Sequence, residues 1–181
     1  MSRAVFLDRD GVLVRAMMVD GKSYAVRRMK DFRLLPSARS AVEALRAAGY
    51  KIVVVTNQPD IGNGLIASRV VEAMHRRLQK AIAPDLIKTC PHRQDDGCDC
   101  RKPKPGMLLA AATELGINLR SSYMVGDRWS DVVAGQSAGC YTLFIDRGYR
   151  DRMTARPDCT VKTLPAAVDM ILGEQQRGLY A

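Results

Sequence analysis

Two short apolar runs, each stopping at a polar residue, constrain the fold of this 181-residue chain more than any other feature. The run in RAVFLDRDG stops at Asp8, and the β-branched run in YKIVVVTNQ stops at Thr56. Both have the continuous apolar character of strands that are buried on both faces of a parallel sheet. The segment SARSAVEALRAAG between them has apolar residues at helical spacing, from Ser37 to Gly49, so it predicts the crossover helix of a βαβ unit.

The same alternation continues along the chain. Further helices are expected at about 68–81, 105–115 and 130–138, and further strands near 86–89, 123–127 and 140–146. This order predicts an α/β fold with a doubly wound, mostly parallel, Rossmann-like sheet that binds ligands at the carboxyl ends of its strands. The length favours one domain, which we place at residues 1–175, followed by a flexible tail at 176–181.

The charge, the apolar runs and the cysteine content indicate which kinds of partner and which cellular compartment to expect. Lys and Arg number 28 against 19 Asp and Glu, a formal charge of +9, but the basic groups are scattered and lack interleaved aromatic residues for base stacking. No apolar run approaches the roughly 18 residues of a membrane span, and no export signal is evident. Five cysteines, an odd number, favour reduced thiols or metal thiolates. We therefore expect a monomeric cytoplasmic protein with neither a nucleic-acid nor a membrane partner.

Carboxylates follow two of the predicted strands. Asp8 and Asp10 end the first strand, and Asp127 and Asp131 follow the strand YMVG. Residues i and i+2 of an extended segment point the same way, so Asp8 and Asp10 can face one site. A lone Asp after a strand is more often a turn or cap residue. Three carboxylates in one crevice would repel one another, however, and so predict a cation such as Mg²⁺.

Four motifs carry a resemblance to a known family. DRDGV, VVVTNQ, RKPKPGM and VGDRWSD, in this order, resemble the signature motifs of the haloacid dehalogenase (HAD) superfamily of phosphatases. CPH followed by CDCRKPKPGM is similar to the zinc-loop branch of that superfamily, which holds heptose bisphosphate and histidinol-phosphate phosphatases. The resemblance implies a Mg²⁺-dependent phosphomonoester hydrolase that works through an aspartyl-phosphate.

The resemblance also implies roles for the carboxylates. Asp8 would be the nucleophile, and Asp10 the acid that protonates the leaving oxygen and later activates water. Mg²⁺ would be held by Asp8, by Asp127 and by the main-chain carbonyl of Asp10. Asp131 would support the water shell of the metal.

Polar and basic residues complete the implied site. The Thr56 hydroxyl and the Asn57 main-chain amide resemble the phosphoryl cradle of the family, and Lys102 resembles its catalytic lysine. Arg101 resembles its substrate-recognition arginine, and Arg128 occupies another basic family position, so both are expected to bind substrate.

The loop between residues 90 and 100 has the pattern C-x-H-x5-C-x-C. Three thiolates and one imidazole make a closed tetrahedral site of the structural Zn²⁺ type, whose ligands would be Cys90, His92, Cys98 and Cys100. A reduced loop whose cysteines are close by chance is the alternative. Because Arg101 and Lys102 follow at once, ordering this loop would also fix two cations beside the crevice.

The gaps between the motifs are too short for a cap domain, so substrate selection is expected to fall to surface loops. The resemblance implies a small phosphorylated sugar, with the 7-phosphate of D-glycero-D-manno-heptose 1,7-bisphosphate as the group removed. Histidinol phosphate, another small metabolite, a polynucleotide 3′-phosphate, and a binding domain without turnover remain alternatives. Val14 and the loop NQPDIGNG, with Asn63, depart from the family pattern. His75 is interpreted as an ordinary helical histidine, and Trp129 is assigned no role.

Overall fold

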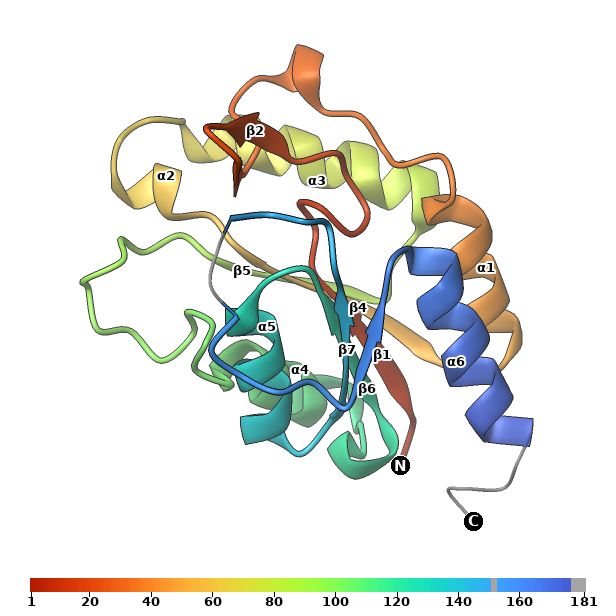
Figure 1. Cartoon of the computed structure of the whole chain (residues 1–181). Coiled ribbons are helices and arrows are strands. Elements are labelled where there is room, and N and C mark those ends of the chain that lie inside the picture. The colour runs from red at the N-terminus through yellow and green to blue at the C-terminus, as the bar shows by residue number, and fades with distance from the viewer. Residues whose placement is uncertain (151–152, 177–181) are drawn as a thin grey trace.

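The computed structural model describes residues 1–150 and 153–176 of the chain. Its centre is a six-stranded sheet of strand order β5-β4-β1-β6-β7-β8, in which each neighbouring pair is parallel (Figure 1). Its strands are β1 (Ala4–Leu7), β4 (Lys51–Asn57), β5 (Leu86–Cys90), β6 (Tyr123–Gly126), β7 (Tyr141–Ile145) and β8 (Cys159–Val161). The chain winds from β1 toward β5 and then crosses to β6 on the other side, so β1 lies where ligands bind in doubly wound sheets.

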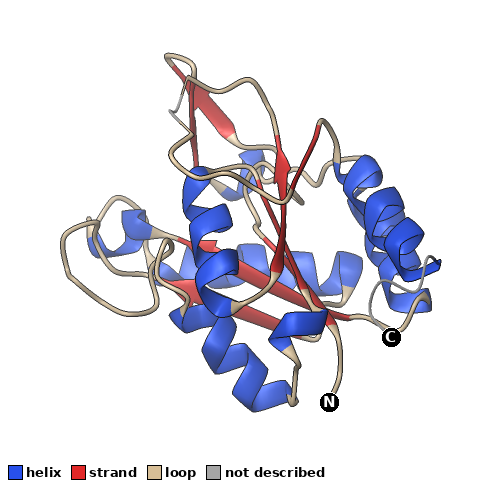
Figure 2. Cartoon of the chain, turned by 60° about the horizontal axis from the view of Figure 1, so that its bottom comes forward, coloured by secondary structure: helices blue, strands red, loops and turns tan. Residues whose placement is uncertain are grey.

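Helices cover both faces of the sheet (Figures 1 and 2). One face packs against α1 (Ala38–Ala47), α3 (Ser68–Ile82) and α6 (Leu164–Gln176), and the other against α4 (Gly106–Leu115) and α5 (Trp129–Ala138). The shorter elements are η1 (Met29–Asp31), α2 (Pro59–Gly62) and η2 (Leu119–Ser121). None of the helices in 1–150 and 153–176 is long and apolar enough to cross a lipid bilayer.

Strand β1 shows why its sequence is apolar throughout. Val5 and Leu7 point into the core beneath α1, α3 and α6, whereas Ala4 and Phe6 point into the core beneath α4 and α5. All four residues are fully buried, as expected for a central strand with helices on both faces. Leu7 pairs in register with Val54 and Val125, so β1, β4 and β6 end close together at one edge of the sheet.

The predicted fold class is confirmed, and each helix and strand that the sequence predicted is observed to within one or two residues at most ends. The sequence analysis gave no range for α2, β8 or α6. The sequence did not predict the antiparallel hairpin of β2 (Met17–Val19) and β3 (Lys22–Tyr24), which lies in the long loop after Asp10. The described residues form no sheet besides this hairpin and the central one. The predicted tail begins at the last residue of α6, Gln176, and 177–181 lie outside the described residues.

Candidate active site

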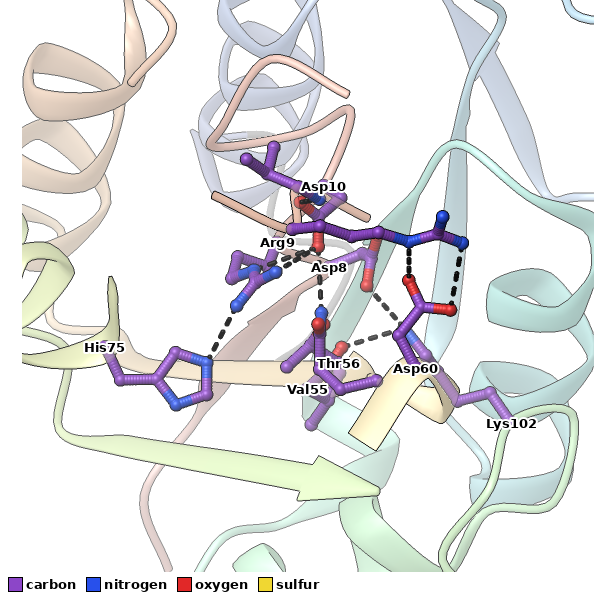
Figure 3. Close-up of polar contacts among 11 residues, drawn as sticks. Asp8, Arg9, Asp10, Val55, Thr56, Asp60, His75 and Lys102 are labelled. Atoms are coloured by element: carbon purple, nitrogen blue, oxygen red, sulfur yellow. Dashed lines mark hydrogen bonds and ion pairs between the residues drawn. The ribbon is translucent and has the colours of Figure 1, made fainter. Parts of the chain in front are cut away.

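Asp8 follows β1 and meets a buried cation at the edge of the sheet (Figure 3). Lys102 Nζ lies 2.7 Å from Asp8 Oδ1 and 2.6 Å from Asp131 Oδ1, and it donates a 2.8 Å hydrogen bond to the carbonyl oxygen of Val55. Burial alone would lower the pKa of Lys102, but the Asp131 and Asp8 carboxylates outweigh it and raise the pKa. Lys102 therefore stays charged and brings together the carboxylates of Asp8, which follows β1, and Asp131, which lies on α5.

Asp127 follows the neighbouring strand β6 and completes a group of three carboxylates. One oxygen each of Asp8, Asp127 and Asp131 lies within 4.8 Å of the others. Both Asp127 oxygens are buried, and no hydrogen bond of good geometry reaches either of them from the described residues, although the Tyr149 hydroxyl lies close enough to interact with Asp127. Burial, together with the negative charges of Asp8 and Asp131, raises the pKa of Asp127 well above its usual value. A cluster of three buried carboxylates with a single lysine to balance them fits a hard divalent cation such as Mg²⁺.

Gly11 is needed for this cluster to form. A Cβ atom at this position would lie 1.8 Å from Asp127 Oδ2, and the backbone φ of +95° is one that side chains other than glycine rarely adopt. The sequence signal for this feature is the Gly in DRDG.

Asp10 lines the same pocket but lies outside the carboxylate cluster. Its Oδ2 accepts a 2.9 Å hydrogen bond from Gln58 Nε2, and its Oδ1 accepts a 3.3 Å hydrogen bond from the Val26 main-chain amide. Burial raises the pKa of Asp10, the adjacent Arg9 opposes this effect, and the Asp8 charge adds to it. A carboxyl group with a raised pKa beside a phosphoryl site is suited to donating a proton.

Thr56 and Asn57 end β4 beside these carboxylates. The Thr56 hydroxyl is buried and accepts a 2.9 Å hydrogen bond from Gln58 Nε2. The Asn57 side chain forms two hydrogen bonds with the main chain of Lys102, at 2.9 and 3.1 Å. The side chain of Asn57 thus fixes the position of Lys102, a contact that the predicted role of its main-chain amide did not include.

One pocket of about 580 Å³ brings together most of the residues predicted for the site. Its lining includes Asp8, Asp10, Thr56, Asn57, Arg101, Lys102, Arg128 and Asp131. Arg101 Nη1 is buried there without a hydrogen-bond partner in the described part of the chain. Arg128 Nη2 donates to the carbonyl and hydroxyl oxygens of Ser23, so it also ties the β2–β3 hairpin to the pocket. Trp129 lines the rim and is partly exposed.

The sequence did not single out one ion pair in the pocket wall. Arg27 Nε and Nη2 donate hydrogen bonds of 2.7 and 3.2 Å to the two carboxylate oxygens of Asp60. This pair joins the segment after β3 to α2, across two of the loops expected to contact substrate. Asp60 belongs to the divergent NQPDIGNG loop, which was the available signal, but its partner lies 33 positions away and cannot be seen in the sequence.

The four predicted zinc ligands lie together in the loop after β5. Their ligand atoms are within 4.8 Å of one another, with His92 Nδ1 3.2 Å from Cys100 Sγ and 3.7 Å from Cys90 Sγ. Cys98 Sγ lies 3.6 Å from the sulfurs of both Cys90 and Cys100. Three sulfurs and one imidazole nitrogen at these separations suit a tetrahedral Zn²⁺ ion.

The Cys/His loop packs against both ends of the short helix α2. The Gln58 amide donates a 2.8 Å hydrogen bond to the carbonyl oxygen of Cys90, and the Gly62 amide donates a 2.9 Å bond to that of Pro91. A Cβ atom on Gly62 would meet the Pro91 carbonyl oxygen at 2.8 Å, so the two segments touch main chain to main chain. The order of this loop is thereby linked to the position of Gln58, which contacts Asp10 and Thr56.

Comparison with known proteins identifies the family. A family model described as HAD-hydrolase-like matches residues 99–167. The D-glycero-beta-D-manno-heptose-1,7-bisphosphate 7-phosphatase of Pseudomonas aeruginosa is 37% identical over 163 residues, which cover 87% of this chain and 89% of the relative. The chain belongs to the HAD-like phosphatases.

Two further relatives bear on this HAD-like phosphatase. The D-glycero-alpha-D-manno-heptose-1,7-bisphosphate 7-phosphatase of Mycobacterium tuberculosis is 39% identical over 78% of each chain. The crystal structure of the D,D-heptose 1,7-bisphosphate phosphatase from B. bronchiseptica, complexed with magnesium and phosphate, matches with a TM-score of 0.80 and 29% identity, covering 95% of this chain and 99% of that one. The relatives thus include enzymes named for each anomer.

Proposed function

We propose that this HAD-like phosphatase removes the 7-phosphate of D-glycero-D-manno-heptose 1,7-bisphosphate through an aspartyl-phosphate on Asp8. The observation that carries the proposal is a buried Asp8 at the end of β1, paired with Lys102 and clustered with the Asp127 and Asp131 carboxylates, beside a pocket lined by basic side chains. The named activity of the relatives supports the substrate.

The reaction begins with attack by an Asp8 carboxylate oxygen on phosphorus. The bond between phosphorus and the sugar oxygen breaks, and Asp10 donates its proton to that oxygen, so the sugar leaves as a neutral alcohol. Asp10, now ionised, accepts a proton from the water that attacks the phosphoryl group on Asp8. Phosphate is released, and both aspartates return to their starting states.

The cations of the site match the charge of the substrate. A phosphomonoester carries a charge of about −1.5 to −2 at neutral pH, so its approach to Asp8 requires compensation. Lys102 supplies one buried positive charge next to Asp8. Asp8, Asp127 and the carbonyl of Asp10 would hold Mg²⁺, and Asp131 has an oxygen close enough to assist. When bound, this ion neutralises charge on the phosphoryl oxygens and orients them.

The rest of the substrate would contact the basic rim. The buried Nη1 of Arg101 lacks a partner among the described residues and can donate to a sugar hydroxyl or a second phosphate. The Cys/His loop would bind Zn²⁺ in a structural role and hold Arg101 and Lys102 in place, because both follow Cys100 directly. We further propose that the enzyme is a monomer and works in the cytoplasm.

A phosphate-release assay in the presence of Mg²⁺ tests this function. It compares kcat/KM for both anomers of heptose 1,7-bisphosphate, histidinol phosphate and a 3′-phosphorylated oligonucleotide. We expect one heptose anomer to be preferred by about ten-fold or more, which is about 1.4 kcal/mol of transition-state discrimination. A preference for histidinol phosphate or the oligonucleotide would overturn the substrate while leaving the chemistry, and no Mg²⁺-dependent release from any of them would overturn both.

A further inference from the structure

A fully buried arginine lies beside the proposed acid of the reaction. Arg9 has no exposed surface, although it follows Asp8 directly in the sequence. Its Nε donates a 2.9 Å hydrogen bond to Asp10 Oδ2, and its Nη2 lies 2.8 Å from the same oxygen. Its guanidinium carbon is 5.7 Å from the centre of the Phe32 ring. A buried arginine costs free energy unless its donors are satisfied, so its partners define its role.

His75 supplies the partner on the other side of Arg9. Figure 3 shows Arg9 between the His75 ring and Asp10, and Arg9 Nη1 lies 3.1 Å from His75 Nε2. A guanidinium can only donate, so His75 Nε2 must accept, which places the ring proton on Nδ1 and leaves the ring neutral. Burial first, and then the charge of Arg9, lower the pKa of His75 to about 4, in agreement with a neutral ring.

His75 lies on helix α3, whose inner face is packed into the core. The buried stripe of this helix contains Val71, Met74 and Leu78, and His75 lies within one turn of all three. The histidine therefore links a core-packed helix to the loop that carries Asp8 and Asp10.

The contacts of Asp10 distinguish its two oxygens. Oδ2 accepts hydrogen bonds of 2.9 Å from Arg9 Nε and from Gln58 Nε2, and Arg9 Nη2 lies 2.8 Å from it as an ion-pair contact without a hydrogen bond of its own. Oδ1 has a single contact, the 3.3 Å hydrogen bond from the Val26 amide. Two short hydrogen bonds and the Arg9 charge occupy Oδ2, whereas Oδ1 accepts one longer bond and keeps a free lone pair, so a proton on Asp10 belongs on Oδ1.

We propose that Arg9 and His75 form a positioning pair that holds Asp10 Oδ2 and leaves Oδ1 to transfer the proton. In phosphoenzyme formation the Oδ1 proton passes to the leaving oxygen as the P–O bond breaks. In hydrolysis Oδ1 accepts the proton of the attacking water. His75 contributes by accepting from Arg9 Nη1, which fixes the plane of the guanidinium and so the rotation of the Asp10 carboxylate. This inference rests on the proposed role of Asp10 as the acid but not on the identity of the sugar.

The test uses phenyl phosphate, 4-nitrophenyl phosphate and 2,4-dinitrophenyl phosphate with the full chain and Mg²⁺. The dinitrophenolate group leaves without protonation, whereas phenol needs an acid, so kcat/KM across the series measures acid assistance to phosphoenzyme formation. His75→Leu removes the acceptor at similar size, and His75→Gln retains an acceptor. We expect His75→Leu to lower kcat/KM for phenyl phosphate by about ten-fold or more and for the dinitrophenyl ester by less than about two-fold. His75→Gln should restore most of the loss.

Two controls separate the possible outcomes. Asp10→Asn should show the same selective loss to a greater degree, and the exposed neighbour Arg76→Gln should match wild type on all three esters. An equal loss on all three esters in His75→Leu, or no recovery in His75→Gln, would show that His75 only packs and would overturn the pair. If Asp10→Asn itself lost the same factor on all three, the acid role in the proposed function would fail, and this inference with it.

Discussion

The carboxylate cluster and the Cys/His cluster are built in opposite ways. Asp8, Asp127 and Asp131 come from the ends of β1 and β6 and from α5, and all three are buried. The sheet brings them together, and Lys102 already pairs with two of them. The four Cys and His residues lie within eleven positions of one loop outside the regular elements apart from Cys90, at the end of β5. The sheet therefore preforms the carboxylate cluster, whereas the Cys/His cluster would depend on the proposed Zn²⁺ ion for its order.

This difference predicts separate consequences for the two metals. Removing Mg²⁺ should stop turnover with little effect on the fold, because the sheet holds its ligands. Removing Zn²⁺ should loosen a loop that has little hydrophobic core of its own, and should affect substrate binding through Arg101 and Lys102.

The largest effect should come from Asp8→Asn. The amide cannot attack phosphorus, so kcat should fall by about a thousand-fold or more. The melting temperature should stay within a few degrees of wild type, because the side chain keeps its shape. Steady-state kinetics and a thermal melt on the same sample check both expectations. A variant that retained activity would show that Asp8 is not the nucleophile, and one that failed to fold would make the carboxylate cluster structural.

Lys102→Met should damage both activity and stability. It leaves Asp8 and Asp131 buried without their cation, and removal of one partner from a buried ion pair typically costs about 3–5 kcal/mol. Urea denaturation measures the loss, with the exposed Lys104→Met as the matched control. If Mg²⁺ restored the stability of Lys102→Met, the ion and the lysine would be partly interchangeable in this cluster, which would sharpen the contrast with the zinc loop.

Zinc removal should have a smaller effect that falls mainly on KM. Treatment with a Zn²⁺ chelator, or Cys98→Ser, should lower the melting temperature by about 5 °C, corresponding to about 2 kcal/mol in a chain of this size, and should raise KM more than it lowers kcat. Cys159→Ser changes a cysteine outside the cluster and should leave the zinc content unchanged. Unchanged melting and kinetics after verified loss of zinc would contradict the structural role of the loop.

The smallest effect should come from Arg27→Ala in the pocket wall. The Arg27–Asp60 pair is partly exposed, so its loss should cost less than about 1 kcal/mol of stability. The wall would lose one link between the hairpin segment and α2, and we expect a rise in KM of a few fold with kcat nearly unchanged. Arg28→Ala, whose pair with Asp31 is more exposed, is the control. A large loss of kcat in Arg27→Ala would place this residue in the chemistry.

The two clusters also differ in how far the sequence could predict them. The four residues of the Cys/His cluster lie close together in the sequence, so their spacing was enough to predict all four as ligands. The carboxylate cluster required the strand pattern, which located Asp8 and Asp127 at one edge because parallel strands end together. The strand pattern did not reveal that Asp131 pairs with Lys102, because that contact depends on where the first turn of α5 lies in the folded structure.

Other features could not be predicted from the sequence, because they depend on packing between segments that are far apart in the chain. The β2–β3 hairpin has strands of three residues, too short for a periodic signal. His75 was interpreted as an ordinary helical histidine, since nothing near it in the sequence is a ligand. Its partner, Arg9, lies 66 positions away. The sequence left open whether His75 is exposed or packed, and only the folded structure shows that it contacts Arg9.

The most direct test of the central claim is to trap the phosphoenzyme. Wild-type enzyme, mixed with heptose 1,7-bisphosphate and Mg²⁺ and quenched in acid within milliseconds, should carry one added phosphoryl group, which peptide mass spectrometry should locate on Asp8. The group should be absent without Mg²⁺ and absent in Asp8→Asn. A phosphoryl group on another residue, or rapid turnover in which no phosphoenzyme forms at any quench time, would contradict the assignment of Asp8 as the nucleophile.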